Sequence, residues 1–334
     1  MPDVSVIIVN YNSGDRLGRC LDCLKAQTFQ DFETIVIDNA SSDGSLERAR
    51  TNGPAAHIIN AGENLGFAAA NNRAAQKATG AWLAFLNPDA YAAPDWLEQL
   101  MAATKRHPWA DAIGSTQLQA GDAARIDGAG DVFHIFGVPY RGHYGWPADK
   151  LPPEGECFSP CAAAALYRRQ TFEALGGFDE DFFCYGEDVD LGFRLRLAGG
   201  RAVQTADAIV YHEGSAVAGR NSEFAVYYGN RNRIWTAYKN MPGVVYWPLL
   251  PVQFAVNCYL LARSWGAGIG PAYWRALKDG YGGLGALRNK RRALQQDRRV
   301  RISDLMKSLA WSPIKIVRRE AVLRPIANDD VAEP

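Results

Sequence analysis

Two adjacent carboxylates, Glu187 and Asp188, stand at the point where a helical pattern of apolar residues begins. The pattern runs from Asp188 to Ala198 and is followed by Gly199-Gly200, a typical helix end. A carboxylate within hydrogen-bond reach of a hydroxyl accepts its proton as that hydroxyl attacks an electrophile. Acids in a first helical turn also stabilise the helix dipole, so the pair alone leaves both interpretations open.

Four groups of polar residues each follow an apolar run that is typical of a strand. They are Asn10-Tyr11-Asn12, Asp38-Asn39, Asn64-Leu65-Gly66-Phe67 and Asn87-Pro88-Asp89. Open α/β sheets bind ligands at the carboxyl edge of their strands, so we expect these groups to line one site. A carboxylate such as Asp38 accepts hydrogen bonds from a ribose or a base, although helix capping and turn formation are open alternatives.

Strand-like and helical patterns alternate over the first 117 residues, which predicts a wound, mostly parallel α/β sheet with flanking helices. The expected strands are Val4–Val9, Thr34–Ile37, His57–Ile59, Trp82–Leu86 and Ala112–Gly114. The expected helices are Arg16–Gln27, Ser45–Arg50, Ala68–Ala78 and Trp96–Arg106. From Asp122 to Glu156 the pattern predicts irregular loops or short antiparallel strands, and further strands are expected at Ala162–Arg168 and Ala208–Tyr211, the last ending at His212.

The composition is that of a globular protein, with 48% hydrophobic and 22% charged residues in 334 and no formal net charge. Zero net charge argues against a surface built to hold nucleic acid. Six cysteines and the lack of a basic and apolar leader before Val4 predict a reduced cytosolic protein. The helical pattern around Cys20 and Cys23 indicates ordinary helix cysteines.

The first strand runs into Asn10-Tyr11-Asn12-Ser13-Gly14, with neither of the usual glycine-rich nucleotide motifs. The segment Val4–Asn12 and six others instead resemble glycosyltransferase family 2, whose members are inverting enzymes with the GT-A fold, and especially its rhamnosyltransferase-like branch. The other segments are Val36–Gly44, Asn64–Asn72, Leu86–Asp89, Gly176–Phe183, Tyr185–Leu191 and Tyr211–Ser215. The resemblance covers roughly residues 3–240 and implies a GT-A domain at 1–240, with a donor half at about 1–117 and an acceptor and catalytic half at about 118–240.

The resemblance implies roles for individual residues. It assigns the general base to Asp188, with Glu187 beside it. It implies that the donor contacts Asn10, Tyr11, Asn12, Asp38, Asn39, Asn64, Gly66, Asn71, Asn87, Arg231 and Arg233. Arginine suits the diphosphate because its guanidinium group donates hydrogen bonds to two phosphate oxygens at once. Arg231 and Arg233 could equally form a solvated helix face.

A divalent cation, Mg²⁺ or Mn²⁺, is the expected cofactor, with Asp89 and His212 as its protein ligands. Asn87-Pro88-Asp89 stands where this fold usually carries Asp-x-Asp, so one carboxylate is missing from the commonest pattern. One carboxylate with diphosphate oxygens and waters still makes a plausible oxygen shell. His212 resembles a histidine that completes the metal site in some relatives, and a structural histidine is the alternative.

The C-terminal region, 241–334, has a charge pattern of its own. Residues 1–262 hold 21 basic and 29 acidic side chains, a net of −8, whereas residues 263–325 hold 15 and 4, a net of +11. The 23 residues from Asn240 to Ala262 are uncharged and rich in Val, Leu, Tyr and Trp, although Pro242, Pro248 and Pro251 make a straight spanning helix doubtful. An apolar run beside aromatic and basic residues predicts a helical tail that associates with a membrane surface, with a spanning helix and a core or homo-oligomer helix as alternatives.

Together these features predict an inverting, metal-dependent glycosyltransferase of polysaccharide biosynthesis, held at the cytoplasmic face of the inner membrane. It would move a sugar from a nucleotide-diphosphate donor to a hydroxyl of a glycan or a lipid-linked acceptor, and nucleic acid is not an expected partner. The resemblance suggests L-rhamnose from dTDP-rhamnose. The alternatives are a sugar nucleotidylyltransferase, which needs a different first loop, and a catalytically silent glycan-binding scaffold subunit.

Overall fold

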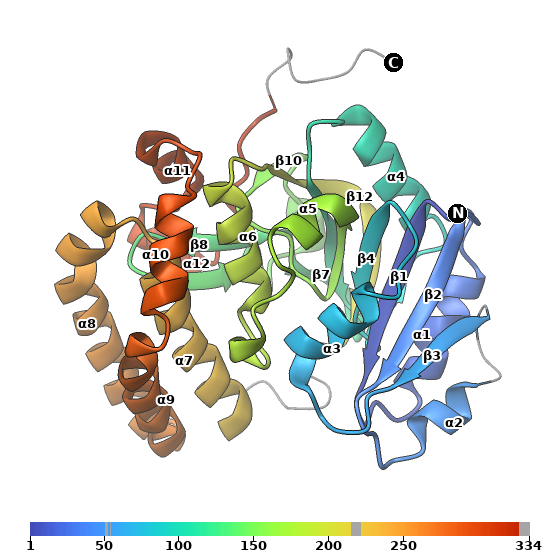
Figure 1. Ribbon diagram of the computed structural model, residues 1–334, viewed down its shortest axis with the longest axis horizontal. Coiled ribbons are helices and arrows are strands. Elements are labelled where there is room, and N and C mark those ends of the chain that lie inside the picture. Colours follow the sequence, from blue (N-terminus) through green and yellow to red (C-terminus); the bar gives the residue numbers. More distant parts are fainter. Residues whose placement is uncertain (51–52, 54, 215–221, 327–334) are drawn as a thin grey trace.

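The computed structural model describes residues 1–50, 53, 55–214 and 222–326. Strands and helices alternate through the first half, as the apolar periodicity predicts (Figure 1). The elements of this half are β1 (Val4–Asn10), α1 (Arg16–Lys25), β2 (Phe32–Asp38), α2 (Ser45–Ala49), β3 (Ala56–Asn60), α3 (Gly66–Ala75), β4 (Trp82–Leu86), β5 (Ala90–Ala92), α4 (Trp96–Arg106) and β6 (Ala112–Gln119). The expected elements all form, and most of their bounds differ from the predicted ones by a few residues.

The second half adds short strands and then helices. Its elements are β7 (Asp122–Gly128), β8 (Asp131–His134), β9 (Val138–Arg141), η1 (Ala148–Lys150), β10 (Gly155–Cys157), β11 (Ala164–Arg168), α5 (Arg169–Ala174), η2 (Glu180–Phe182), α6 (Glu187–Leu197) and β12 (Ala202–His212). The C-terminal region comprises α7 (Glu223–Asn240), α8 (Gly243–Gly266), α9 (Gly270–Gly282), η3 (Gly283–Gly285), α10 (Arg288–Gln296), α11 (Ile302–Ser308) and α12 (Pro313–Arg318). The segment from Asp122 to Glu156 therefore forms short antiparallel strands, one of the two forms expected for it.

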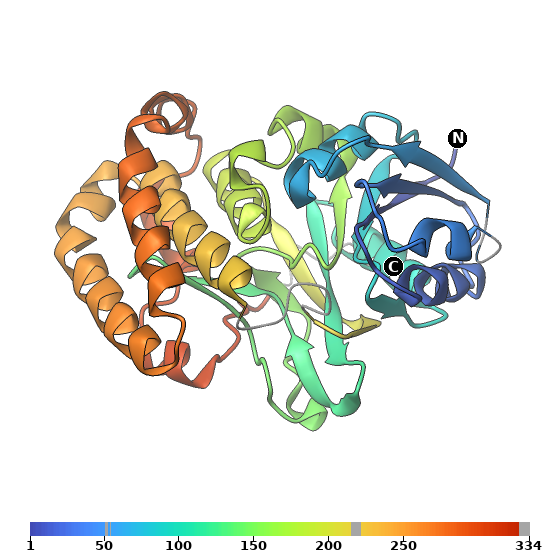
Figure 2. The same cartoon turned by 90° about the horizontal axis from the view of Figure 1, so that it is seen from below.

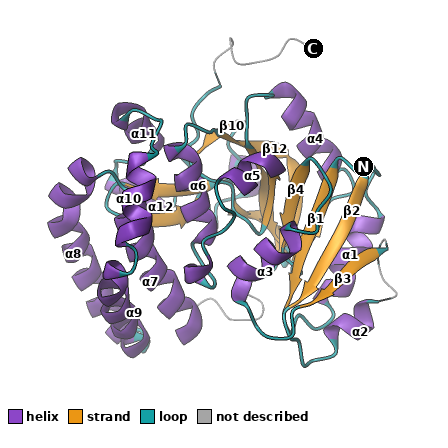
Figure 3. Cartoon of the chain, in the orientation of Figure 1, coloured by secondary structure: helices purple, strands orange, loops and turns teal. Residues whose placement is uncertain are grey.

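Within the described residues, one mixed sheet has the strand order β10-β12-β6-β11-β4-β1-β2-β3. Strands β3, β2, β1 and β4 are parallel, whereas β11 is antiparallel to both of its neighbours, β4 and β6. Helices cover both faces of the sheet (Figure 3). The wound, mostly parallel sheet predicted from the sequence is thereby confirmed, and the reversed strand β11 separates the parallel strands β4, β1, β2 and β3 from the β6–β12 pair.

Alternate side chains of β1 enter two different hydrophobic clusters, as the period of a strand requires. Val4, Val6 and Ile8 pack with α1 and α4 on one face of the sheet. Ile7 packs with α3, α5 and α6 on the other. Because α6 packs on this second face, its N-terminal residues are held against the carboxyl edge of the central strands.

Helices α7 to α10 form a layer at the end of the molecule opposite β1–β3, and α8 is the outermost of them (Figures 1 and 2). This layer shares a hydrophobic cluster with the body, in which Phe133 and Phe193 pack with Met241 and Tyr246. The last described residues return to the sheet edge, where the backbones of Glu156 and Arg324 exchange hydrogen bonds of 2.8 and 2.9 Å. Residues after 240 therefore pack tightly against the domain that precedes them.

Helix α8 has an inverted pattern of exposure. Its buried side chains are Tyr246, Gln253, Asn257 and Ser264, spaced so that they share one helix face. Its large apolar side chains point outward, with Trp247, Phe254 and Tyr259 each more than half exposed. The helix is continuous through both internal prolines, and it is long and apolar enough to cross a membrane by length and composition. Within a single chain, α8 is therefore not a buried core helix.

Candidate active site

The donor edge predicted from the sequence forms where β1 and β2 end. Asn10 donates from Nδ2 to Asp38 Oδ1 at 2.8 Å and to Ser41 and Ser45, so this buried amide ties both strand ends to the following turn. Asp38 also accepts the Ser41 backbone N–H at 3.2 Å. Asn39 donates to Asn64 at 2.8 Å and accepts from Leu65 N–H at 2.9 Å. The amides thus act as a scaffold under the edge, and Asp38 is held in a fixed orientation with 6% of its surface exposed.

The remaining donor-edge residues differ in what they contact. Tyr11 is 38% exposed beside this edge, and Asn12 has a φ of 46° and accepts the Ser42 N–H at 2.9 Å. The side chain of Asn87 has no hydrogen-bond partner in the part of the chain that the structure describes. Asn71, in contrast, is 2% exposed and donates to Phe67 O inside its own helix, so it does not face the edge.

Gly66 begins α3 with a φ of +77°, and an added Cβ would lie 2.5 Å from Phe183. The backbone N–H of Phe67 donates to Phe183 O at 2.6 Å. A glycine is required here because Phe183, in the loop before α6, comes this close. This contact joins the donor half directly to the segment that carries Glu187 and Asp188.

The loop that precedes Glu187 is strained and firmly held. Phe183 and Tyr185 have φ values of 64° and 69°, an unfavourable region for aromatic residues. Asn232 on α7 donates from Nδ2 to the carbonyls of Phe182, Cys184 and Tyr185, at 2.9, 2.9 and 2.6 Å. One buried amide therefore fixes the turn that delivers the two carboxylates.

Neither of the two arginines predicted to contact the donor diphosphate lies free at the edge. Arg231 donates to the carbonyls of Asp181 and Phe182, both at 3.0 Å, and stacks against Trp235. Arg233 is 7% exposed and donates to Asn257 and Tyr273 between α8 and α9. The guanidinium of Arg233 points to the C-terminal helices, and that of Arg231 holds the loop beside Asn232. Their contact with the donor diphosphate stays a prediction.

Asp188 and Glu187 occupy different environments. Asp188 is half-buried, and its carboxylate accepts the backbone N–H of Ala162 at 3.1 Å and that of Val189 at 2.8 Å. Glu187 is buried, and its Oε2 has no hydrogen-bond partner in the described chain. Burial, and then the charge of Asp188, raise the pKa of Glu187 well above its usual value. Glu187 therefore keeps its proton to a higher pH than an exposed glutamate does, beside an oriented Asp188.

The register of β5 against β12 brings Asp89 to His212, because Ala90 pairs with His212. His212 Nε2 lies 3.3 Å from Asp89 Oδ1, and this buried nitrogen makes no hydrogen bond to the described residues. His212 Nδ1 lies 2.8 Å from Asp127 Oδ2. Burial alone would lower the pKa of His212, but Asp127 and Asp89 raise it above its usual value. Ser215, in the same predicted motif, lies outside the described residues.

Three residues that the sequence analysis missed complete the site: Asp127, Asp131 and Arg141. Arg141 on β9 pairs with Asp127, and the β8–β9 register places it opposite Asp131. Carboxylate oxygens of Asp131 and Asp188 and the sulfur of Cys161 lie within 4.8 Å of one another. Burial, and then the charge of Asp188, raise the pKa of Asp131 well above its usual value. A continuous row of polar groups thus runs from Asp89 to Asp188.

Comparison with known proteins gives a consistent assignment. Residues 5–176 match the family model described as glycosyl transferase family 2. The chain is 30% identical over 246 residues to N-acetylglucosaminyl-diphospho-decaprenol L-rhamnosyltransferase of Mycobacterium tuberculosis, covering 66% of this chain and 80% of that protein. It is 32% identical over 238 residues to the O-antigen biosynthesis protein RfbC of Myxococcus xanthus, covering 64% of this chain and 18% of that protein.

Among solved structures, the fold is similar to a mannosyltransferase from Pyrobaculum calidifontis in complex with GDP-Man and Mn²⁺. The TM-score is 0.54 at 21% identity, over 92% of this chain and 87% of that chain. The fold is also similar to residues 1–349 of S. aureus TarS in complex with UDP-GlcNAc. That TM-score is 0.56 at 17% identity, over 93% of both chains.

Proposed function

Because the chain belongs to glycosyltransferase family 2, we propose that it transfers L-rhamnose, with inversion, from a nucleotide-diphosphate donor to a hydroxyl of a glycan or a lipid-linked acceptor. Family membership makes it a nucleotide-sugar glycosyltransferase and excludes a nucleotidylyltransferase. The rhamnosyltransferase from M. tuberculosis and the O-antigen protein from M. xanthus support rhamnose and a cell-surface glycan. The single observation that carries the proposal is the row of groups from Asp89 to Asp188 at the carboxyl edge of the sheet.

Asp188 is the proposed general base. Two backbone N–H groups fix its orientation, and it stands next to Glu187, whose pKa is raised by burial and by the charge of Asp188. The acceptor hydroxyl would give its proton to Asp188 as its oxygen bonds to the anomeric carbon, while the bond from that carbon to the diphosphate oxygen breaks with its electron pair leaving on the diphosphate. Because attack and departure take place on opposite faces, the configuration is inverted.

The residues at Asp89 fit a divalent cation. An unpartnered, buried imidazole nitrogen 3.3 Å from a carboxylate oxygen is a nitrogen and oxygen donor pair that accepts Mg²⁺ or Mn²⁺. Asp89 and His212 would hold the cation, and Asp127 would orient the imidazole through its Nδ1. When bound, the cation would neutralise the negative charge of the departing diphosphate. Asp38, held by Asn10, is the proposed acceptor of hydrogen bonds from the donor nucleoside.

We also place the protein at the cytoplasmic face of the inner membrane, bound by its C-terminal helices. Support comes from the outward apolar face of α8 and the net charge of +11 in residues 263–325. A lipid-linked acceptor would be presented at that surface. A second copy of the chain covering α8 is the alternative for this face.

Thermal shift of the purified protein against a panel of nucleotide sugars, with and without Mn²⁺, tests the donor assignment. We expect dTDP-rhamnose to raise Tm most, and to do so more with Mn²⁺ present. A larger shift with a different nucleotide sugar would refute rhamnose. Slow donor hydrolysis in the absence of acceptor separates an enzyme from a silent scaffold subunit, which would release no nucleoside diphosphate.

A further inference from the structure

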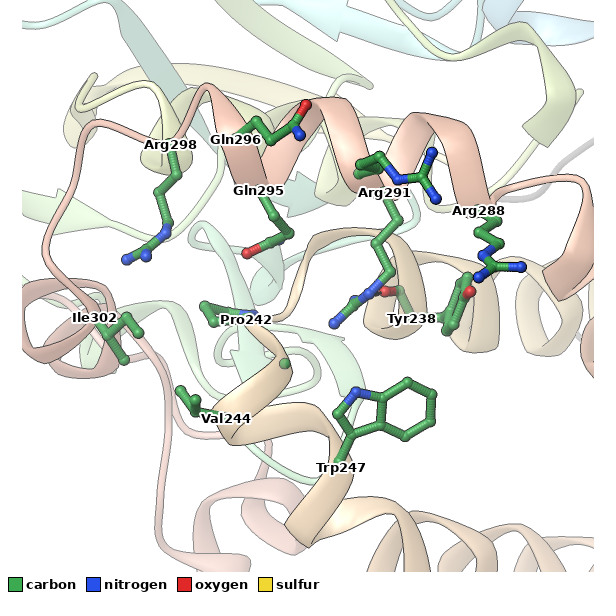
Figure 4. Close-up of a pocket in the computed structure, with 12 residues that line it drawn as sticks. Tyr238, Pro242, Val244, Trp247, Arg288, Arg291, Gln295, Gln296, Arg298 and Ile302 are labelled. Atoms are coloured by element: carbon green, nitrogen blue, oxygen red, sulfur yellow. Dashed lines mark hydrogen bonds between the residues drawn. The ribbon is translucent and has the colours of Figure 1, made fainter.

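A pocket of about 510 Å³ lies where α7 ends, α8 begins and α10 crosses them (Figure 4). Four arginines line it, and no acidic residue does: Arg288, Arg291, Arg292 and Arg298. Its opposite wall is formed by Tyr238 and by the first turn of α8, including Val244 and Trp247. The pocket therefore joins a strongly positive wall to an apolar one, and the catalytic row from Asp89 to Asp188 does not contribute to it.

The arginines are only partly used within the protein. Arg291 extends from α10 toward Trp247, donates to Tyr238 O and stacks on Tyr238 at 5.1 Å from the ring centre (Figure 4). Arg288 and Arg292 are exposed, and within the described chain neither forms an ion pair or a hydrogen bond. The Nε of Arg298 is buried and has no hydrogen-bond partner there. Several guanidinium donors thus line a pocket that has no acidic side chain in its lining.

The apolar wall continues outward along α8. Val244 is 71% and Trp247 is 57% exposed, and Phe254 follows on the same helix at 59%. The polar residues of α8 face the protein, so its apolar surface has no partner within the described chain. A ligand that satisfies both walls carries an anionic group at one end and a long apolar chain at the other.

We propose that this pocket binds the phosphate-bearing headgroup of a membrane lipid, with its hydrocarbon chain against the exposed face of α8. Arg288 and Arg292 would donate hydrogen bonds to the phosphate oxygens, because a planar guanidinium group can bind two oxygens at once. Trp247 would lie at the boundary between headgroup and chain, where its amphipathic ring is favoured. This inference rests on the proposed membrane location and is independent of the sugar transferred.

The test is cosedimentation of the full-length protein with phosphatidylcholine vesicles that contain phosphatidylglycerol. The double variant R288Q/R292Q should bind these vesicles about 30-fold more weakly, because the two guanidinium groups that hydrogen-bond the headgroup phosphate in the pocket are lost. The matched control is R299Q/R301Q, which removes the same charge from the same basic segment outside the pocket and should weaken binding less than about 3-fold. Circular dichroism and donor hydrolysis in solution, which should match wild type, report folding and the catalytic site separately.

If the two double variants lose the same vesicle affinity, the basic residues act only by general attraction to the anionic surface, and the proposed headgroup site is refuted. Wild-type protein that stays in the supernatant would overturn the lipid assignment, as would binding of inorganic pyrophosphate without any binding of vesicles. A wild-type dimer that becomes monomeric on Trp247→Glu substitution would assign the face of α8 to a second copy. If the protein binds lipid but hydrolyses no donor, the proposed function is refuted, whereas the proposed headgroup site in the pocket is still supported.

Discussion

Lys239, near the end of α7, is almost fully buried against the loop that leads to Asp188, and the ion pairs around it stabilise the fold. Its ammonium is 1% exposed and pairs with Asp179 at 2.5 Å and Asp190 at 2.7 Å. Asp179 also receives Lys290 at 2.7 Å. Burial would raise the pKa of Asp179, but Lys239 and Lys290 outweigh it and lower that pKa from 3.8 to about 2.

A carboxyl group whose pKa is lower in the folded state stabilises the fold above its unfolded pKa and loses that contribution as pH falls through the folded value. The difference between 3.8 and about 2 corresponds to about 2.4 kcal/mol at pH 7 and about 1.3 kcal/mol at pH 3. Asp179→Asn should therefore lower the free energy of unfolding by about 2.4 kcal/mol at pH 7, and by roughly half of that at pH 3.

Urea unfolding followed by tryptophan fluorescence at both pH values measures this difference. The matched control is Asp181→Asn, because Asp181 pairs with the same Lys290 at 2.6 Å but is 49% exposed. An exposed pair of that kind contributes less than about 1 kcal/mol. If the Asp179 and Asp181 variants lose the same stability, or the loss for Asp179 does not shrink at pH 3, the buried ion pair does not hold α7 as argued.

The remaining predictions concern the catalytic edge. Asp188→Asn should reduce kcat about 100-fold or more with little change in the donor KM, and near wild-type turnover would exclude Asp188 as the base. Asp89→Ala and excess EDTA should each abolish transfer, and full activity in EDTA would exclude a metal role. Glu187→Gln should keep activity within about 10-fold. The pKa of Glu187 is higher in the folded state than its unfolded value near 4.5, so its ionisation destabilises the fold as pH rises above that value. The free energy of unfolding of E187Q should therefore fall less than that of wild type as pH rises above about 4.5.

The donor half was predictable because period-2 and helical patterns are local. Val4–Val9 alternates between two faces, and each polar group that follows a strand lies at the edge where parallel strands end. Glu187 and Asp188 were found for the same reason, since a helix start is a local signal. Asp127, Asp131 and Arg141 were missed because they lie in an aperiodic segment, and only the pairing of β7, β8 and β9 brings them to the site.

The residue that fixes the loop around Arg231 was not predicted, for a related reason. Charge drew attention to Arg231 and Arg233, whereas Asn232 between them makes the three bonds that fix the loop before Glu187. A buried amide has no sequence signal that separates it from an exposed one. The polar stripe of α8, in contrast, had a signal: Gln253, Asn257 and Ser264 recur at helical spacing within an apolar run, which indicates an inward polar face.

These contacts argue that the C-terminal helices support the catalytic loop as well as a membrane surface. Asn257 of α8 accepts from Arg233 of α7, and the adjacent Asn232 holds the carbonyls of the loop that delivers Asp188. Asn240 donates to Asp190, two residues after the proposed base, at 2.7 Å. A chain cut after residue 239 would lose Asn240 and the partners of Arg233 together with the apolar face of α8. Lost activity in such a fragment would therefore not distinguish a membrane role from a structural one, and point substitutions on the exposed face of α8 are needed to separate them.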